Sequence, residues 1–159
     1  MKLKELVRKI KTVMQDIGVI RNEDQYLRLK ERLKKAEGFY PKAYKCPADK
    51  LTIGYGRNIE DNGITKEEAE YLLENDIATA IRETKGVFGD FNKFSSARQN
   101  ALVDMMFNMG KPTFLKFKRM ISAIKEKDWQ KASIEAKFSR WYNQVGDRAK
   151  RIVLELKEG

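Results

Sequence analysis

The sequence predicts an α+β fold that is mainly helical, with a small β-hairpin lobe and a larger helical lobe. Over most of the chain, apolar residues recur every three to four positions, which is the period of an amphipathic helix. The exception is the stretch from Tyr40 to Gly56, where prolines and glycines flank two short β-prone runs, near 43–45 and 51–55. A hairpin of this size is marginal alone, so we expect it to pack on the helical body, with a cleft where the two lobes meet.

The first expected helix is amphipathic and lies in residues 1–17. Its apolar face is formed by Leu3, Leu6, Ile10, Val13 and Ile17. Lysines and an arginine occupy its other faces, and Gly18 is placed to end it. Such a helix packs on the core, or contacts an anionic membrane or a partner protein. We therefore divide the chain into an N-terminal helical extension, residues 1–26, and a main domain, residues 27–159.

Two further helices are expected on either side of the hairpin. Asn22 with Gln25 resembles a capping box, and the apolar stripe that follows runs up to Gly38. Thr65 with Glu68 forms a second capping box, which opens a long helix.

The C-terminal half predicts one more long helix and several short ones. Ser96 with Gln99 is expected to open the long helix, and Gly110 to end it. Asp128 and Asp147 are expected to cap two of the short helices. The last of these carries an apolar face made of Ala149, Ile152, Val153 and Leu156.

The charge of the chain limits its partners. The formal net charge is +10, from 33 Lys and Arg against 23 Asp and Glu. Such a surface accumulates polyanions, which include nucleic acid, anionic membranes and acidic cell-wall polymers. The chain has no zinc-finger spacing and no RNP-type aromatic motif, so nucleic acid is not the expected partner. Apolar runs are too short for a membrane span or a secretory signal, and we expect no signal peptide.

The chemistry is limited by two residue types. The chain has no histidine, so proton transfer near neutral pH falls to carboxylates, the thiol, or a perturbed lysine or tyrosine. Its single cysteine excludes an intramolecular disulfide and a metal site built from several cysteines. We expect neither a metal nor a cofactor.

Glu37, Cys46 and Thr52 are the candidate reactive groups, separated by eight and then five residues. Glu37 falls in the last turn of a predicted helix, where the helix dipole and neighbouring aromatic residues disfavour its ionised form. The hairpin supplies the thiol and the hydroxyl. Taken singly, each residue also fits an ordinary role: a solvated glutamate, a buried cysteine and a strand threonine.

The segment EGFYPKAYKCPADKLTIGYG resembles the catalytic segment of the phage-type lysozymes, glycoside hydrolase family 24, which includes the lysozyme of T-even phages. The family motif is Glu, eight residues, Asp or Cys, five residues and Thr, and it matches Glu37, Cys46 and Thr52 without a gap. The resemblance continues through ITKEEAEYLLENDI and ALVDMMFNMG and closes with SRWYNQVGDRAKRI. It covers about residues 27–157.

The resemblance implies a lysozyme-like two-lobed fold and a muramidase that hydrolyses the β-1,4 bond between N-acetylmuramic acid and N-acetylglucosamine in bacterial peptidoglycan. It implies a Glu–Cys–Thr catalytic triad. Glu37 protonates the glycosidic oxygen, and Thr52 holds the attacking water of an inverting reaction. Cys46 assists that water or, as a thiolate, stabilises the developing oxocarbenium charge.

Other positions carry over from the family in the same way. Arg148 matches the arginine that pairs with the catalytic glutamate from the other lobe. Matches to substrate-binding positions are Gly56, Phe107, Asn108, Ser139 and Arg140. The methionines around Phe107 are expected to belong to the core.

The sequence departs from the family pattern in two places. Arg57 stands where relatives often have a histidine, and Asp76 occupies the place of that histidine's partner, so we expect an Arg57–Asp76 ion pair. The segment from Arg57 to Thr65 is short, so the small lobe lacks the helical insertion of larger relatives.

The expected role is that of a monomeric endolysin, kept in the host cytoplasm until holin-dependent release, or carried in the virion. One alternative is a lytic transglycosylase, which leaves 1,6-anhydro ends in place of reducing ends. Another is a non-catalytic cationic protein that binds the cell wall or a membrane through the same fold.

Overall fold

The computed structural model describes residue 12 and residues 23–159. The chain divides into two compact units, an N-terminal unit of residues 1–65 and a C-terminal unit of residues 66–159. The helix predicted in residues 1–17 and the capping residue Asn22 lie outside the described residues. The division into an extension, residues 1–26, and a main domain stays a prediction.

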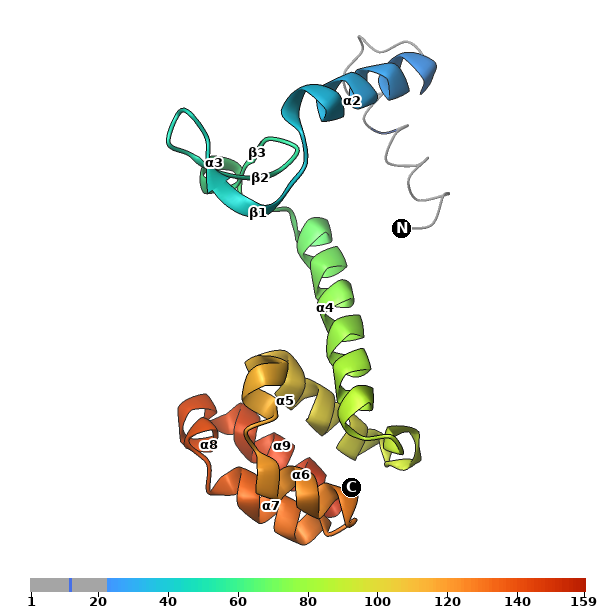
Figure 1. Cartoon of the computed structure of the whole chain (residues 1–159), viewed down its shortest axis with the longest axis vertical. Helices are drawn as coiled ribbons and strands as arrows, with labels where there is room; N and C mark the ends of the chain where they lie inside the picture. The colour runs from blue at the N-terminus through green and yellow to red at the C-terminus, as the bar shows by residue number, and fades with distance from the viewer. Residues whose placement is uncertain (1–11, 13–22) are drawn as a thin grey trace. The chain divides into compact units, whose positions relative to one another are not determined.

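The N-terminal unit combines one helix with a small antiparallel sheet in the order β1-β2-β3 (Figure 1). Its elements are α2 (Glu23–Glu37), β1 (Tyr40–Lys45), β2 (Leu51–Gly54), β3 (Arg57–Asn58) and α3 (Ile59–Asn62). The helix that ends near Gly38 and the two β runs are confirmed. The sequence did not predict β3 or α3. The side chain of Asn58 caps α3 by accepting a hydrogen bond from the Asp61 N–H at 3.0 Å.

The turn between β1 and β2 is held by its own backbone and by α3. The Cys46 N–H donates to the Lys50 carbonyl at 3.0 Å, and the Asp49 N–H donates to the Cys46 carbonyl at 2.8 Å. The Glu60 carboxylate accepts from the Leu51 N–H at 3.0 Å. These contacts fix the segment that carries the candidate thiol and hydroxyl.

Ion pairs strengthen the same link between the turn and α3. Lys45 and Lys50 each lie 3.4 Å from Glu60. Lys50 also pairs with Asp61 at 2.8 Å.

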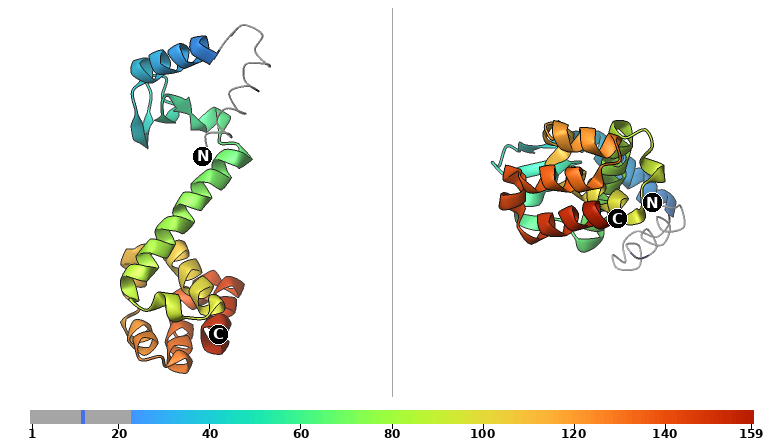
Figure 2. Two further views of the ribbon diagram at one scale, coloured as in Figure 1. Left: turned by 90° about the vertical axis from the view of Figure 1, so that its right-hand side faces the viewer. Right: turned by 90° about the horizontal axis from the view of Figure 1, so that it is seen from below.

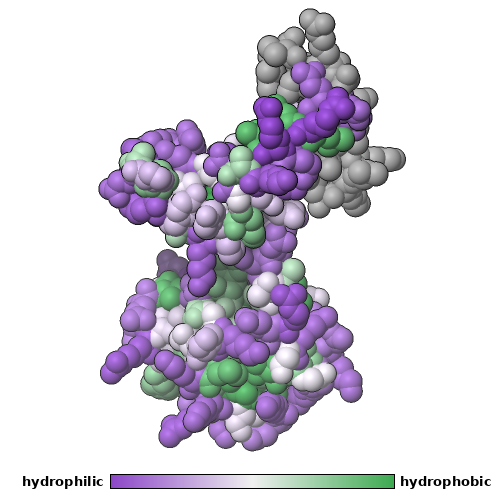
Figure 3. Space-filling view, turned by 45° about the horizontal axis from the view of Figure 1, so that its top comes forward, coloured by the Kyte–Doolittle hydropathy of each residue, from purple (hydrophilic) through white to green (hydrophobic). Residues whose placement is uncertain are grey.

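The C-terminal unit is helical throughout. Its elements are α4 (Lys66–Val87), a short 3₁₀ helix (Phe91–Lys93), α5 (Ser96–Phe114), α6 (Lys118–Lys125), α7 (Trp129–Lys137), α8 (Arg140–Val145) and α9 (Asp147–Glu158). Helices α6, α7 and α9 lie side by side, with α5 packed against α9 (Figure 2). On the face shown in Figure 3, a hydrophobic area near the middle of this unit is bordered by hydrophilic residues.

The core of this unit is built mainly from α5, α6, α7 and α9, and the segment after α4 adds phenylalanines to it. Its fully buried large side chains include Phe88, Leu102, Met105, Ile152 and Leu156. Three of the four apolar residues predicted for the last helix are buried, and Val153 is partly buried against them. Met105 and Met106 are core residues, as expected.

The predicted caps of α5 need correction. Ser95, not Ser96, is the N-cap, and its hydroxyl accepts from the Arg98 N–H at 3.3 Å. The Gln99 amide instead donates to two carbonyls of the preceding loop, at 3.0 and 3.1 Å. Gly110 does break the helix, with φ 72° and ψ 157°, but one more turn follows before α5 ends at Phe114.

The two predicted aspartate caps have different outcomes. Asp128 caps α7, because its side chain accepts from the Lys131 N–H at 2.9 Å. The prediction for Asp147 is wrong: Gly146, with φ 65°, is the residue that precedes α9. Asp147 is the first residue of α9, and its carboxylate pairs with Lys150 at 2.8 Å.

Arg98 joins the beginning of α5 to the end of α9. Its Nε donates to the Leu156 carbonyl at 3.1 Å, and its Nη2 donates to the Lys157 carbonyl at 3.2 Å. The guanidinium also lies 4.4 Å from the ring centre of Trp129. Carbonyls that the last turn of a helix leaves without partners are thereby satisfied.

The mainly helical α+β fold with a small antiparallel sheet is confirmed. Within the described part of the chain, no helix has both the length and the apolar character needed to cross a membrane.

Candidate active site

Glu37 is the last residue of α2, as the sequence predicted. The chain turns immediately after it at Gly38, whose φ is +68° and whose N–H donates to the Lys34 carbonyl at 3.1 Å. The Glu37 carboxylate then lies against the backbone of Gly56. A Cβ added at Gly56 would be 2.5 Å from Oε2 of Glu37, so any other residue there would displace this carboxylate.

Cys46 begins the β1–β2 turn and is half-buried. Hydrogen bonds from the backbone N–H groups of Lys50 and then Ala48 lower the pKa of the Cys46 thiol below its ordinary value, and a hydrogen bond with the Thr52 side chain acts the same way. Burial opposes these effects. Backbone amides, rather than the nearby lysine side chains, are thus the main groups that stabilise a thiolate here.

Thr52 is buried on the central strand β2, at 3% exposure. It pairs with Tyr44 on one side and with Asn58 on the other. Its hydroxyl donates to the Lys50 carbonyl at 3.0 Å. The hydroxyl has one proton, which it donates either to this carbonyl or to a Cys46 thiolate, and in both cases its oxygen can accept a further hydrogen bond.

Tyr44 is influenced electrostatically by two of the three predicted reactive groups, Cys46 and Glu37. Its pKa is raised, first by desolvation and then by the negative charges of Tyr40, Cys46 and Glu37. The phenol therefore lies within electrostatic reach of both the thiol and the carboxylate. The structure brings Cys46 and Thr52 into hydrogen-bonding contact, and the charge of Glu37 acts on Tyr44. The joint role of Glu37, Cys46 and Thr52 stays a prediction. The sequence identified Tyr44 only as an aromatic neighbour.

The aromatic residues after Glu37 do not enclose it. Phe39 is 63% exposed, and its ring packs on Tyr55 with a centroid distance of 5.3 Å. Glu37 is itself exposed within the N-terminal unit. The apolar surroundings expected for the carboxylate are thus not formed by this unit.

The C-terminal unit has a pocket of about 530 Å³ between α4 and α5. The wall from α4 is largely apolar, with Leu73, Ile77 and Ile81. Asp104, Phe107 and Arg148 contribute the other side. Phe107, predicted to bind substrate, is 39% exposed and also borders a second, smaller pocket of about 200 Å³.

Asp104 holds the predicted partner of Glu37. Arg148 donates from Nε to Oδ1 of Asp104 at 2.6 Å, and Arg151 donates from Nη2 to Oδ2 at 2.8 Å. One carboxylate is shared by two guanidinium groups, and Arg151 also lies 3.9 Å from the Glu155 carboxylate. The predicted Arg148–Glu37 pair joins the two units and stays a prediction.

Asp104 was not among the site residues that the sequence predicted. The available indication was a single acidic residue inside the apolar run ALVDMMF, one helical turn before Phe107.

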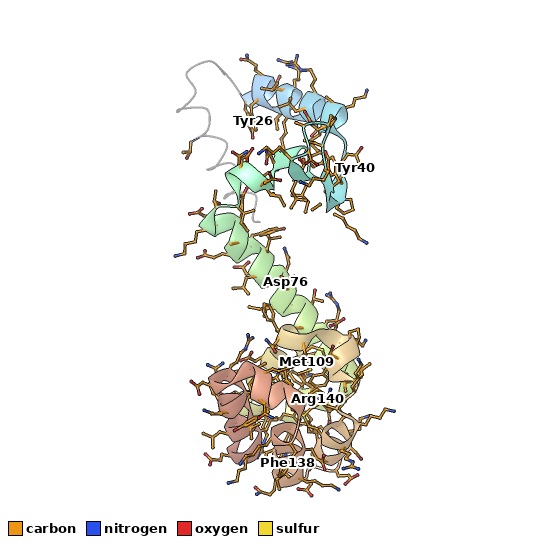
Figure 4. All side chains as sticks on the ribbon, turned by 90° about the vertical axis from the view of Figure 1, so that its left-hand side faces the viewer. Tyr26, Tyr40, Asp76, Met109, Phe138 and Arg140 are labelled. Carbon is orange, nitrogen blue, oxygen red and sulfur yellow. The ribbon has the colours of Figure 1, made fainter. Side chains whose placement is uncertain are left out.

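The other predicted substrate-binding residues lie near α8. Oδ1 of Asn108 accepts from the Trp141 Nε1–H at 2.7 Å. Ser139 caps α8, because its hydroxyl accepts from the Tyr142 N–H at 3.2 Å and donates to the Ala136 carbonyl at 2.6 Å. Arg140 is exposed (Figure 4). Their saccharide contacts stay predictions.

Arg57 makes a bidentate contact that the sequence did not predict. Its Nε and Nη2 donate to the Gly63 carbonyl at 3.0 and 2.8 Å. Asp76 lies on α4, in the other unit (Figure 4). The Arg57–Asp76 ion pair would join the two units and stays a prediction.

Known proteins are similar to this chain over most of its length. The family model described as "Phage lysozyme" matches residues 34–155, a range that contains the Glu–Cys–Thr positions and Arg148. A protein named "Probable T4-type lysozyme 2", from Dictyostelium discoideum, is 30% identical over 160 residues, which cover 82% of this chain and 94% of that protein.

Two phage proteins are similar over a shorter range. The "Endolysin" of Acyrthosiphon pisum secondary endosymbiont phage 1 is 33% identical over 115 residues, which cover 69% of this chain and 73% of that protein. The "Pre-baseplate central spike protein Gp5" of Enterobacteria phage T4 is 37% identical over 114 residues, which cover 69% of this chain and 20% of that protein. From the family match and the lysozyme relatives it follows that this chain belongs to the phage lysozyme family and is a peptidoglycan-cleaving glycoside hydrolase.

Proposed function

We propose that the protein is a muramidase that hydrolyses the β-1,4 bond between N-acetylmuramic acid and N-acetylglucosamine, with inversion at the anomeric carbon. The observation that carries this proposal is the arrangement in the N-terminal unit. A glutamate lies against a glycine that leaves it room, and a buried threonine contacts a cysteine whose thiol pKa is lowered. These groups supply an acid and a water-holding pair without any histidine.

Glu37 acts as the general acid and protonates the glycosidic oxygen as the bond breaks. A water attacks the anomeric carbon from the opposite face of the sugar. The Thr52 hydroxyl donates its proton within the protein, to the Lys50 carbonyl or to the Cys46 thiolate, so its oxygen accepts a hydrogen bond from that water and orients it. Cys46, as a thiolate, accepts the proton of the water or stabilises the positive charge that develops on the sugar ring.

Glu37→Gln tests the acid. The amide cannot give up a proton, so cleavage should fall by about 10²–10⁴-fold, the usual contribution of a positioned general acid. Release of reducing ends from purified sacculi measures the change. Glu31→Gln, which alters an exposed glutamate of the same helix, is the matched control and should retain activity. If Glu37→Gln cleaves at the wild-type rate, Glu37 is not the acid.

The products test the type of reaction. Hydrolysis leaves reducing N-acetylmuramic acid ends, whereas a transglycosylase leaves 1,6-anhydro ends, and mass spectrometry of digested sacculi separates the two. Inversion of a β bond first yields the α-anomer, which NMR detects before mutarotation. Anhydro products or a first-formed β-anomer would each contradict the proposed mechanism.

We also propose that the enzyme serves host cell lysis. One phage relative is named an endolysin and another a pre-baseplate central spike protein, so two routes to the cell wall are considered for this chain: holin-dependent release from the cytoplasm and carriage in the virion. Expression in bacteria with and without a co-expressed holin distinguishes them. Lysis that depends on the holin supports the endolysin role, and enzyme found in purified virions supports the other.

A further inference from the structure

Asp104 is an acidic residue inside an apolar run of α5. The next two residues in the chain, Met105 and Met106, are buried in the core, and the Asp104 side chain is only 22% exposed. A carboxylate in such a place is costly unless charged or hydrogen-bonding groups surround it. Two guanidinium groups do so here, those of Arg148 and Arg151, and both come from α9.

The two arginines bind different oxygens of this carboxylate. Arg148 contacts Oδ1, with Nε at 2.6 Å and Nη2 at 2.5 Å. Arg151 donates from Nη2 to Oδ2 at 2.8 Å. The contact to Oδ2 restrains the rotation of the carboxylate, so Oδ1 is presented to Arg148 in one direction.

Stability alone does not account for this arrangement. An ion pair that is largely removed from water often stabilises a fold no better than apolar residues of similar size. Arg148 is also the second residue of α9, where the helix dipole disfavours a positive charge. The contribution that is specific to Asp104 is therefore the orientation that it gives to its partners.

The orientation of Arg148 matters because its guanidinium is a rigid planar group with several N–H donors. Asp104 holds the edge formed by Nε and Nη2, so the direction of Nη1, on the other side of the group, is fixed as well. Arg148 is partly exposed and lines the pocket of about 530 Å³ together with Phe107. A cationic donor with a fixed direction is thus available at the wall of this pocket.

We propose that Asp104 is a positioning residue of the glycosidase, which holds the Arg148 guanidinium in the orientation that the reaction requires. This inference rests on the proposed function and on the predicted pairing of Arg148 with Glu37. Negative charge develops on the Glu37 carboxylate as it gives its proton to the glycosidic oxygen. A donor that is already oriented stabilises that charge better than a mobile one, because it needs no reorganisation during the reaction. Asp104 acts on the reaction only through Arg148.

Asp104→Asn tests the position of the guanidinium. The amide keeps the size of the side chain but loses the charge that holds Arg148. We expect kcat on purified sacculi to fall about tenfold with KM unchanged, because a misplaced donor affects the transition state and not substrate binding. Asp90→Asn is the matched control, since it removes one negative charge of the same unit, the partner of Lys127, and it should keep the wild-type kcat. A rise in KM with kcat preserved, or equal losses of kcat in both variants, would overturn the inference.

A double-mutant cycle tests whether Asp104 acts through Arg148. Arg148→Ala should lower kcat by itself, and Asp104→Asn should have little further effect in that background. Unfolding is measured for each protein, so that a smaller folded fraction is not counted as a lower kcat. If the two losses of kcat multiply, Asp104 acts independently of Arg148 and the inference is wrong.

Arg148→Lys is a second variant that leaves the carboxylate in place. Lysine keeps the positive charge but cannot contact Oδ1 through a planar edge. The fall in kcat should therefore be similar to that in Asp104→Asn. A wild-type kcat in Arg148→Lys would show that charge suffices without orientation, and this result decides the inference even if Asp104→Asn does not fold.

The outcomes also separate this inference from the proposed function. If wild type releases no reducing ends from sacculi, the proposed function fails and the inference fails with it. If wild type cleaves and Asp104→Asn keeps the wild-type kcat, the inference alone fails.

Discussion

At the scale of single residues, the site depends on a glycine as much as on its reactive groups. Gly56 combines a positive φ of +74° with direct contact to the Glu37 carboxylate. Gly54, the last residue of β2, has a φ of +68° but no atom within 4 Å of an added Cβ. Substitutions at the two glycines therefore distinguish the effect of backbone strain from the effect of crowding the Glu37 carboxylate.

Gly56→Ala should therefore abolish most activity, because the new methyl group displaces the Glu37 carboxylate. Gly54→Ala should retain activity. Both changes should reduce the free energy of unfolding by about 1 kcal/mol, since alanine is strained at positive φ. Thermal unfolding and sacculus digestion measure the two effects. Equal activity losses would show that strain, not crowding, decides the outcome.

Cys46 is tested by its pH dependence. If the thiolate acts, kcat/KM should rise with pH through the lowered pKa of the thiol. Cys46→Asp should move this rise to lower pH, because a carboxyl ionises earlier than a thiol. Cys46→Ala should be far less active. Activity of Cys46→Ala equal to that of Cys46→Asp would give this position a structural role.

The spacing of the triad could be predicted because it follows the order of the chain. The contacts of Tyr44 and Asp104 could not, because they depend on which residues tertiary packing brings together. Tyr44 comes within electrostatic reach of Glu37 only after the hairpin folds back on the end of α2. Asp104 meets Arg148 only when α9 packs on α5.

At the scale of elements, long helices were predictable because their apolar residues recur over several turns. Short elements were not predictable. The strand β3 has two residues and α3 has four, so neither carries a periodic pattern. Asn58 takes part in both, as the last residue of β3 and as the N-cap of α3. The cap of α5 was misplaced by one residue because Ser95 and Ser96 are chemically identical, and only the backbone decides between them.

Ser95→Ala should reduce the free energy of unfolding by about 1 kcal/mol, the usual effect of losing an N-cap hydroxyl. Ser96→Ala changes an exposed residue inside the first turn and should have a smaller effect. Chemical denaturation of both variants measures this. A larger loss in Ser96→Ala would contradict the assignment of the cap.

The link between the β1–β2 turn and α3 should weaken in acid. The Leu51 N–H lowers the pKa of Glu60 below 4.5, and Lys50 lowers the pKa of Asp61 below 3.8. Their contribution to stability is therefore present above those values and is lost as pH falls through the lower folded-state pKa values. Hydrogen exchange at the Leu51 amide should show protection at neutral pH that decreases in acid.

Glu60→Gln should remove much of that pH dependence. Glu31→Gln, outside this network, should keep the wild-type profile. If the Leu51 amide keeps the same protection at acid and neutral pH in the wild type, the carboxylates do not hold the turn.

At the scale of the whole molecule, stability is concentrated in the helical core of the C-terminal unit. Leu102 is fully buried there, whereas Leu154 is 51% exposed. Leu102→Ala should reduce the free energy of unfolding by about 2–5 kcal/mol, because it removes buried methyl groups and leaves a cavity. Leu154→Ala should change it far less. Urea denaturation measures both, and similar losses would contradict this location of the core.

The bonds from Arg98 to the last turn of α9 bear on the order of events during synthesis. The ribosome makes α9 after α5, yet Ile152 and Leu156 of α9 fill the core that α5 begins. The C-terminal unit therefore cannot complete its folding before α9 has left the ribosome.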